Sequence, residues 1–258
     1  MDVATFLAVA RLREMGHAPS TVFLGIGATK GSFSGGTVAS GLGAGADPDF
    51  AAFSHPFALA SGEEGRPPEF PAVLYNGHLE RWMGQGWLGA NFMELINIEN
   101  SKIIYRSRSL LRPLYGNLAY KEGLLFPSRW VAWAATSALG LAAAVLRAAP
   151  DLLLRLGVLP KPSEGPSKAL QESGFFNLHV VAETDDAEGA HSRVHVKGVR
   201  GDPGYRSTAA MAAECAACLA SQHPSLPGAG GGVLTPASCF GAAVVAYLAD
   251  AGMTFDVT

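Results

Sequence analysis

Two segments in which apolar and polar side chains alternate constrain the fold of this chain more than any other feature. Residues 175–180 (FFNLHV) and 192–197 (SRVHVK) both show this alternation, and a polar loop containing Gly189 separates them. A period of two is typical of β-strands with one buried face, and two such runs joined by a polar loop favour an antiparallel hairpin. The sequence therefore predicts antiparallel sheet in the core.

The N-terminal part predicts a helix, a strand and a second helix, in that order. Apolar residues recur at helical spacing over 3–15, with Asp2 as the expected N-cap and Gly16 at the expected end. Residues 21–26 (TVFLGI) are β-branched and aromatic, which indicates a strand, and a glycine-rich turn leads from them to a helix that begins near 34–37.

The middle of the chain predicts a second hairpin and a further strand. Residues 72–75 and 78–82 flank Asn76-Gly77, a pair that accepts the positive φ angles of a type I′ turn. Residues 102–106 predict another strand. Residues 43–71 are rich in Gly, Pro and Ala and predict a surface loop.

The C-terminal part predicts two helices and a last strand. One helix covers 207–222, and the other covers 236–251 with Thr235 as its cap. Apolar residues alternate over 253–257, which indicates a terminal strand. The fold class expected from all these elements is α/β (α+β): a mixed, largely antiparallel sheet with flanking helices.

Residues 126–160 form an apolar helical segment at the centre of the chain. Residues 130–146 carry no charge, Arg129 and Arg147 bracket them, and a second apolar stretch follows Pro150. A membrane-spanning helix needs about 20 apolar residues, and this run is short and rich in alanine, which disfavours a span.

Two interpretations of this segment stay open beside the disfavoured span. The first is a helix buried in the core or in a homodimer interface, because apolar runs shorter than a span are more often core helices. The second is a helix pair lying on a lipid surface, since Trp130 and Trp133 with flanking arginines are typical anchors at a membrane interface.

Charge and cysteine content exclude some classes of protein. The net charge is −3 and the isoelectric point is about 6.2, so no basic field attracts nucleic acid, and we expect no nucleic-acid partner. Three cysteines, an odd number, do not form the disulfide framework of a secreted protein. We read no signal peptide and expect an intracellular protein that is not secreted. A charged fraction of only 16% suggests that some apolar surface is covered by a partner, a membrane or another domain.

The glycine patterns do not predict a dinucleotide site. A G-x-G-x-x-G turn needs a strand before it and a helix directly after it, because the pyrophosphate lies at the helix N-terminus. Residues 25–30 (GIGATK) carry Lys30 in place of the third glycine, and residues 84–89 (GQGWLG) follow no hydrophobic strand. No G-K-[ST] sequence occurs, which excludes a P-loop.

The candidate metal ligands are better explained as structural residues. Cys215 and Cys218 form a C-x-x-C in an alanine-rich segment without a second ligand pair, and buried thiols are the favoured interpretation. His179 and His195 lie on the paired strands but have no carboxylate or thiol neighbours in sequence. We therefore expect no metal site.

Residues 34–37 (SGGT) are more suggestive. Free amides at a helix start, unshielded by side chains, bind anions or carbonyls because their N–H groups point outward along the helix dipole. A Ser-capped helix with glycines for close packing explains the same four residues, and both interpretations stay open.

Several blocks of the sequence together resemble the saccharopine dehydrogenase-like oxidoreductases, which include bacterial trans-acting enoyl reductases of lipid synthesis. Their order and spacing cover nearly the whole chain. The blocks are Ser34-Gly35-Gly36-Thr37 with Ser40; Arg106-Ser107 with Leu110-Leu111 and Tyr115-Gly116; 162–167 (PSEGPS); 201–205 (GDPGY) with Thr208; and 231–237 (GGVLTPA).

The resemblance implies that residues 1–258 are the C-terminal, substrate-side portion of a two-domain enzyme whose nucleotide-binding half is not in this chain. It implies NAD or NADP as cofactor, bound mainly by residues absent here, and residues 232–258 packing on the missing domain. The apolar stripe of Phe240, Val244 and Leu248 is then expected to be an exposed interface in this chain. It gives no catalytic residue. The substrate or cofactor contacts that it implies are Ser34, Gly35, Gly36, Thr37, Arg106, Ser107 and Tyr115.

Two functions follow as expectations. The first is the substrate-binding portion of an NAD(P)-dependent oxidoreductase that acts on a hydrophobic or lipid-like substrate. The alternative is a non-enzymatic protein bound to a membrane or lipid-droplet surface, derived from the same fold and motivated by the apolar centre. A shared fold serves many chemistries, so activity on saccharopine itself does not follow from the resemblance.

Overall fold

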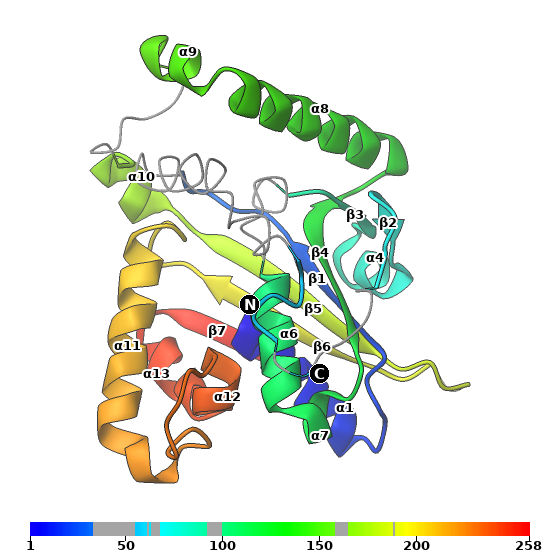
Figure 1. The fold of residues 1–258 in the computed structure, drawn as a ribbon, viewed down its shortest axis with the longest axis vertical. Helices are drawn as coiled ribbons and strands as arrows, with labels where there is room; N and C mark the ends of the chain where they lie inside the picture. Colours follow the sequence, from blue (N-terminus) through cyan, green and yellow to red (C-terminus); the bar gives the residue numbers. More distant parts are fainter. Residues whose placement is uncertain (33–54, 61, 63–67, 92–99, 158–164, 188) are drawn as a thin grey trace.

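A computed structural model of the chain describes all residues except 33–54, 61, 63–67, 92–99, 158–164 and 188 (Figure 1). The described residues form a seven-stranded sheet in the order β2-β3-β4-β1-β5-β6-β7. The strands are β1 (Thr21–Ile26), β2 (Leu74–Tyr75), β3 (Trp87–Gly89), β4 (Ala119–Phe126), β5 (Phe176–Glu183), β6 (His191–Gly198) and β7 (Met253–Val257). Among these strands β1 and β4 pair in parallel and every other neighbouring pair is antiparallel. The expected α/β fold with a mixed, largely antiparallel sheet is confirmed.

Helices flank both faces of this sheet. They are α1 (Asp2–Glu14), α4 (Gly77–Met83), α6 (Ser101–Leu110), α7 (Arg112–Tyr115), α8 (Arg129–Ala148), α9 (Pro150–Arg155), α10 (Lys168–Ser173), α11 (Arg206–Gln222), α12 (Pro236–Phe240) and α13 (Val244–Asp250), with a short 3₁₀ helix η1 at His223–Ser225. The larger core lies between the sheet and α1, α6, α12 and α13, and a smaller core lies under α4 on the opposite face. The sheet is therefore buried on both faces at its centre.

Side-chain alternation along β1 shows how the two cores are built. Val22 and Leu24 point into the larger core, whereas Phe23 points into the smaller one beside Leu79 of α4. Gly25 lacks a side chain because the side chain of Leu125 on β4 occupies that space: a Cβ there would lie 2.7 Å from Leu125 Cδ1. An apolar run without polar positions is what a central strand needs.

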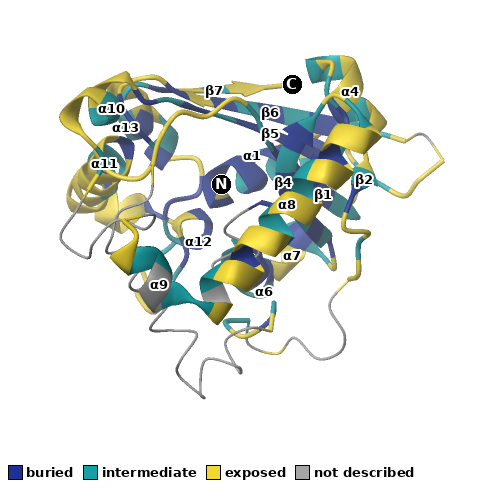
Figure 2. Cartoon of the chain, turned by 90° about the horizontal axis from the view of Figure 1, so that it is seen from above, coloured by how far each residue is buried: buried dark blue, intermediate teal, exposed yellow. Residues whose placement is uncertain are grey.

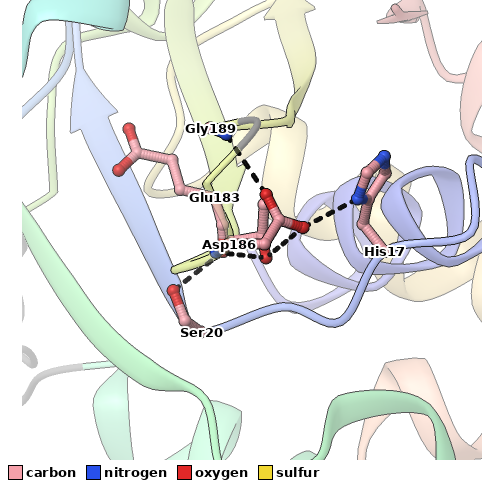
Figure 3. Close-up of polar contacts among 6 residues, drawn as sticks. His17, Ser20, Glu183, Asp186 and Gly189 are labelled. Atoms are coloured by element: carbon pink, nitrogen blue, oxygen red, sulfur yellow. Dashed lines mark hydrogen bonds and ion pairs between the residues drawn. The ribbon is translucent and has the colours of Figure 1, made fainter.

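The predicted hairpin of β5 and β6 is confirmed, with His179 opposite His195. Its turn is attached to the loop before β1, as Figure 3 shows: His17 Nδ1 lies 2.8 Å from Asp186 Oδ2, and Gly189 N donates to Asp186 Oδ1 at 3.2 Å. At the start of β1, Ser20 donates both its backbone N–H and its hydroxyl to the carbonyl oxygen of Glu183. These contacts fix the register at one end of the sheet.

The predictions for α1, β1, α11 and β7 are also confirmed, but Asp2 is not the cap of α1. Met1 is the N-cap, and Asp2 lies buried in the first turn, where its carboxylate binds other elements. The helix predicted over 236–251 is two helices, because Gly241 adopts φ 55° and interrupts it after Phe240. Thr235 caps α12 with a complete capping box, as expected.

The hairpin predicted at Asn76-Gly77 is wrong. Asn76 has φ −128° and is the N-cap of α4; its Oδ1 accepts a hydrogen bond of 2.9 Å from Leu79 N. Asparagine favours helix caps as well as turns, and the full burial of Leu79 stabilises the helical alternative. Strand β2 pairs instead with β3.

The strand predicted over 102–106 is also wrong, because these residues lie within helix α6. Ile104, Tyr105, Ser107 and Arg108 are buried, which is the spacing of a helix with one face in the core.

The structure reverses two expectations about apolar surface: a stripe expected to be exposed is buried, and a helix that could be buried is exposed. The stripe of Phe240, Val244 and Leu248 is buried within this chain, so the expectation that it forms an exposed interface is wrong. The packing of residues 232–258 on further polypeptide stays a prediction. Helix α8, in contrast, is not a core helix of this chain, since only 11% of Arg129–Leu146 is buried.

Candidate functional site

Buried polar groups gather where the start of α1, the middle of α6 and the start of α12 meet. Ser107 Oγ donates to Asp2 Oδ1 at 2.7 Å and lies 2.6 Å from Thr235 Oγ1. The backbone N–H of Ala237, in the first turn of α12, donates to Asp2 Oδ2 at 2.7 Å. We call Asp2, Ser107, Thr235 and Ala237 the Asp2 cluster. It joins three helices that are far apart in sequence.

Burial governs the electrostatics of this cluster. Loss of solvent raises the pKa of Asp2 above its usual value, and the hydrogen bonds from Ser107 and Ala237 only partly oppose that shift. Tyr115 lies close enough to respond to the same carboxylate: burial, and then the charge of Asp2, raises the pKa of its hydroxyl well above the usual value. Tyr115 therefore keeps its proton at neutral pH.

The hydroxyl of Tyr115 is fully buried and has no hydrogen-bond partner among the described residues. A buried phenol usually finds a partner, because an unpaired buried polar group costs about 1–3 kcal/mol. Tyr115 thus offers an unused donor beside the Asp2 cluster.

A second set of buried polar groups surrounds Glu122 on β4. Asn91 Nδ2 and Asn100 Nδ2 each donate to Glu122 Oε1 at 3.2 Å, and Tyr120 OH donates to Glu122 Oε2 at 2.8 Å. Burial raises the pKa of Tyr120 well above its usual value, and the neighbouring Glu122 raises it further. We call Glu122, Tyr120, Asn91 and Asn100 the Glu122 cluster.

The two clusters share one electrostatic environment. The charge of Asp2 also contributes to the raised pKa of Tyr120. Two carboxylates and two protonated phenols therefore lie in the same interior, on the side of the sheet that carries α1 and α6. Such an arrangement can hold protons and position polar groups, as the side chains of an acid–base site do.

The opposite face of the sheet carries a pair of histidines. The rings of His179 and His195 stack with centroids 4.1 Å apart, and Trp82 of α4 meets both edge-on. Burial lowers the pKa of His179 to about 4, and His195 and Lys197 contribute to that shift. His179 is therefore a neutral, packed side chain at pH 7.

Metal-ligating geometry is not seen at this pair. Within the described residues, no group of three His, Cys, Asp or Glu side chains is placed to hold a metal ion.

The structure brings some of the expected site residues together. Ser107 belongs to the Asp2 cluster and Tyr115 lies beside it, whereas Arg106 points to the surface and donates from Nη2 to Val233 O at 3.1 Å. Ser34, Gly35, Gly36 and Thr37 lie outside the described residues.

Sequence reasoning missed Asp2 as a buried acceptor and missed the Glu122 cluster entirely. Glu122 stands next to Lys121 in a strand that also carries a tyrosine, so no local pattern marks it as a buried acceptor. No local signal links Asp2 to Ser107.

Neither glycine pattern forms a dinucleotide cradle in the described residues. Gly25 lies inside β1, where it pairs with Gly123 on one side and His179 on the other. Gly84 ends α4 with φ 68°, and β3 follows it, so this pattern runs from helix to strand, the reverse of the order that binds a pyrophosphate.

Comparison with known proteins shows homologues over most of the chain. The "Putative trans-acting enoyl reductase" of Mycobacterium tuberculosis is 32% identical over 248 residues, which is 89% of this chain and 57% of that protein. Proteins named "Trans-acting enoyl reductase" from Mycobacterium bovis and Mycobacterium leprae are 29% identical over 62% of this chain and 27% identical over 79% of it. They match over 39% and 50% of their own lengths. No protein-family model and no solved structure matches the chain.

Proposed function

We propose that this chain is the substrate-side portion of an NAD(P)-dependent enoyl reductase, an oxidoreductase with a saccharopine-dehydrogenase-like, two-domain arrangement. The observation that carries the proposal is the 32% identity, over 89% of the chain, to a protein whose name states that activity. The names of the relatives suggest an oxidoreductase, and we propose NAD or NADP as its cofactor.

The length of the relatives supports the division into two parts. This chain spans 57% of the length of the Mycobacterium tuberculosis relative, which leaves the rest of such a protein to hold the coenzyme. The described residues show no dinucleotide cradle, because Gly25 lies inside β1 and Gly84 ends a helix that leads into β3. We therefore assign no step of the reaction to a coenzyme held by this chain.

Burial separates the proposed contacts into two roles. Arg106 is partly exposed and stays a proposed contact with substrate or cofactor. Ser34 to Thr37, outside the described residues, stay proposed contacts as well. Ser107 and Tyr115 are fully buried, so in this conformation they position α6 and α7 and do not touch a substrate. We propose the Asp2 cluster as the support that orients the surface around Arg106.

The proposed substrate is hydrophobic or lipid-like, and the proposed location is inside the cell, without nucleic acid as a partner. Cys215, Cys218 and Cys239 are free thiols, which fits a reducing compartment. A homodimer stays a proposal that the exposed α8 would permit.

The alternative is a non-enzymatic, lipid-surface protein of the same fold, and the exposed apolar side chains of α8 favour it. The two proposals differ in coenzyme binding. The longest natural protein that contains this chain should bind NADH or NADPH and oxidise it in the presence of a long-chain enoyl thioester. If that protein neither binds nor oxidises either coenzyme, the enzymatic proposal is wrong and the alternative is favoured.

A further inference from the structure

Helix α8 carries an apolar face along its length that no element of the described residues covers. Trp130 is 79% exposed and Leu141 is 67% exposed, and Trp133 and Val145 are also exposed. These residues recur at helical spacing and turn away from the sheet, while Ala132 and Ala143 of the same helix are buried. In Figure 2, exposed residues recur along α8 from one end to the other, between partly buried ones.

The middle of α8 is attached to the sheet. The backbone N–H of Ala90, just after β3, donates to Thr136 Oγ1 at 3.1 Å. A Cβ at Gly89 would lie 2.7 Å from the same oxygen, so the helix approaches the strand as closely as a glycine permits. A helix held at its middle lies tangential to the folded body, as α8 does in Figure 1.

This attachment argues against a membrane span. The helix is long and apolar enough for a span, but a helix that crosses a bilayer alone is surrounded by lipid over about 30 Å. Thr136 and Ala132 face protein instead. The exposed stripe, at about 1.5 Å per residue over the 20 residues of α8, is about 30 Å long and suits an interface parallel to its axis.

Charge and aromatic placement select the kind of surface. The sequence of α8 contains no Asp or Glu, and Arg129 at its start is exposed. Arg155, the last residue of α9, and Leu156 after it are exposed as well. Tryptophan beside arginine is the usual combination at the headgroup level of a bilayer with anionic lipid.

We propose that α8 docks flat on an anionic membrane surface, with Trp130, Trp133, Leu141 and Val145 in the headgroup region and Arg129 beside lipid phosphates. The docking is independent of the proposed activity, because it requires neither coenzyme nor substrate. It places the folded body on the water side of the membrane.

Flotation with vesicles of phosphatidylcholine and phosphatidylglycerol in equal parts tests the proposal. The chain should float with these vesicles, and Trp130→Ala with Trp133→Ala should weaken the partition roughly tenfold for each tryptophan. Leu141→Ser should weaken it too, whereas Val199→Ser, at a residue that is 65% exposed before α11, should not. Arg129→Glu should weaken it in these vesicles and have little effect without phosphatidylglycerol.

Two measurements make the proposal falsifiable. Quenching by brominated lipids should place Trp130, and a tryptophan introduced by Leu141→Trp, at the same shallow depth; unequal depths would indicate a span and overturn flat docking. Sedimentation without lipid should give the same oligomeric state for the native chain and for the Trp130→Ala, Trp133→Ala variant. A dimer that dissociates in the Trp130→Ala, Trp133→Ala variant, with no flotation of the native chain, would assign the face to a second copy instead.

Discussion

Ser107 Oγ on α6 donates a hydrogen bond of 2.7 Å to Asp2 Oδ1 on α1, between residues 105 positions apart in sequence. Both side chains are buried, and the same carboxylate accepts from the first turn of α12. Through the carboxylate of Asp2, the expected site residue Ser107 is therefore joined to both α1 and α12.

Removal of the hydroxyl should destabilise this junction. Ser107→Ala leaves the buried carboxylate of Asp2 with one donor fewer, which should lower the free energy of unfolding by about 1–3 kcal/mol in urea denaturation. Ser109→Ala is the matched control on the same helix, since Ser109 donates only to the carbonyl of Arg106 in its own helix. Equal losses in the two variants would contradict the role assigned to Ser107.

Stability should fall in mild acid because of His179. Its pKa in the folded protein is about 4, below the usual 6.5, so the unfolded state binds this proton first as the pH falls. The stability contributed by the neutral ring is present above pH 6.5 and should be lost toward pH 4, by up to about 3 kcal/mol. Urea denaturation at several pH values in this range measures how the free energy of unfolding depends on pH. This dependence should be weaker for His179→Phe than for the native chain, whereas His223→Gln, at an exposed residue, is the control that should match the native chain.

The cap of α4 gives a third prediction. Asn76→Ala removes the acceptor for Leu79 N and the donor that bonds to Glu183 Oε1 at 2.7 Å, which should cost about 1–2 kcal/mol. Asn76→Ser keeps a capping oxygen and should recover part of the loss. A serine variant as unstable as the alanine variant would show that capping contributes little here.

Close approach of two strands gives a fourth prediction. A Cβ at Gly123 would lie 2.4 Å from the carbonyl oxygen of Gly89, so Gly123→Ala must separate β3 from β4. We expect a clear fall in melting temperature. Gly140→Ala, in the open middle of α8, meets nothing within 4 Å and should stabilise the helix by up to about 1 kcal/mol. A harmless Gly123→Ala would contradict the observed spacing of the strands.

Local patterns predict those elements in which the spacing of apolar residues fits a strand or a helix but not both. The alternation around His179 and His195 predicts β5 and β6. Strand β6 buries every second residue, whereas β5, inside the sheet, is buried on both faces from Leu178 to Ala182. Residues 102–106 were too short a window, since a lysine, two isoleucines and a tyrosine fit either period until Ser107 and Arg108 are counted with them. Asn76 suits a turn and a cap equally well, and burial of Leu79 decides between them.

The candidate site was less predictable than the fold. Ser107 and Tyr115 were expected from a resemblance, but their link to Asp2 exists only in the folded chain. Glu122 gave no signal of its own because its donors, Asn91 and Asn100, come from segments whose position depends on the whole sheet. The exposure of α8 likewise depends on what packs beside it, which composition alone does not reveal.

The most direct test is coenzyme titration of two proteins: residues 1–258 alone and the longest natural protein that contains them. Fluorescence of NADPH should change on binding to the longer protein and stay unchanged with this chain, because the described residues form no dinucleotide cradle. Tight binding of NADPH by residues 1–258 alone would contradict the claim that the coenzyme site lies in polypeptide outside this chain.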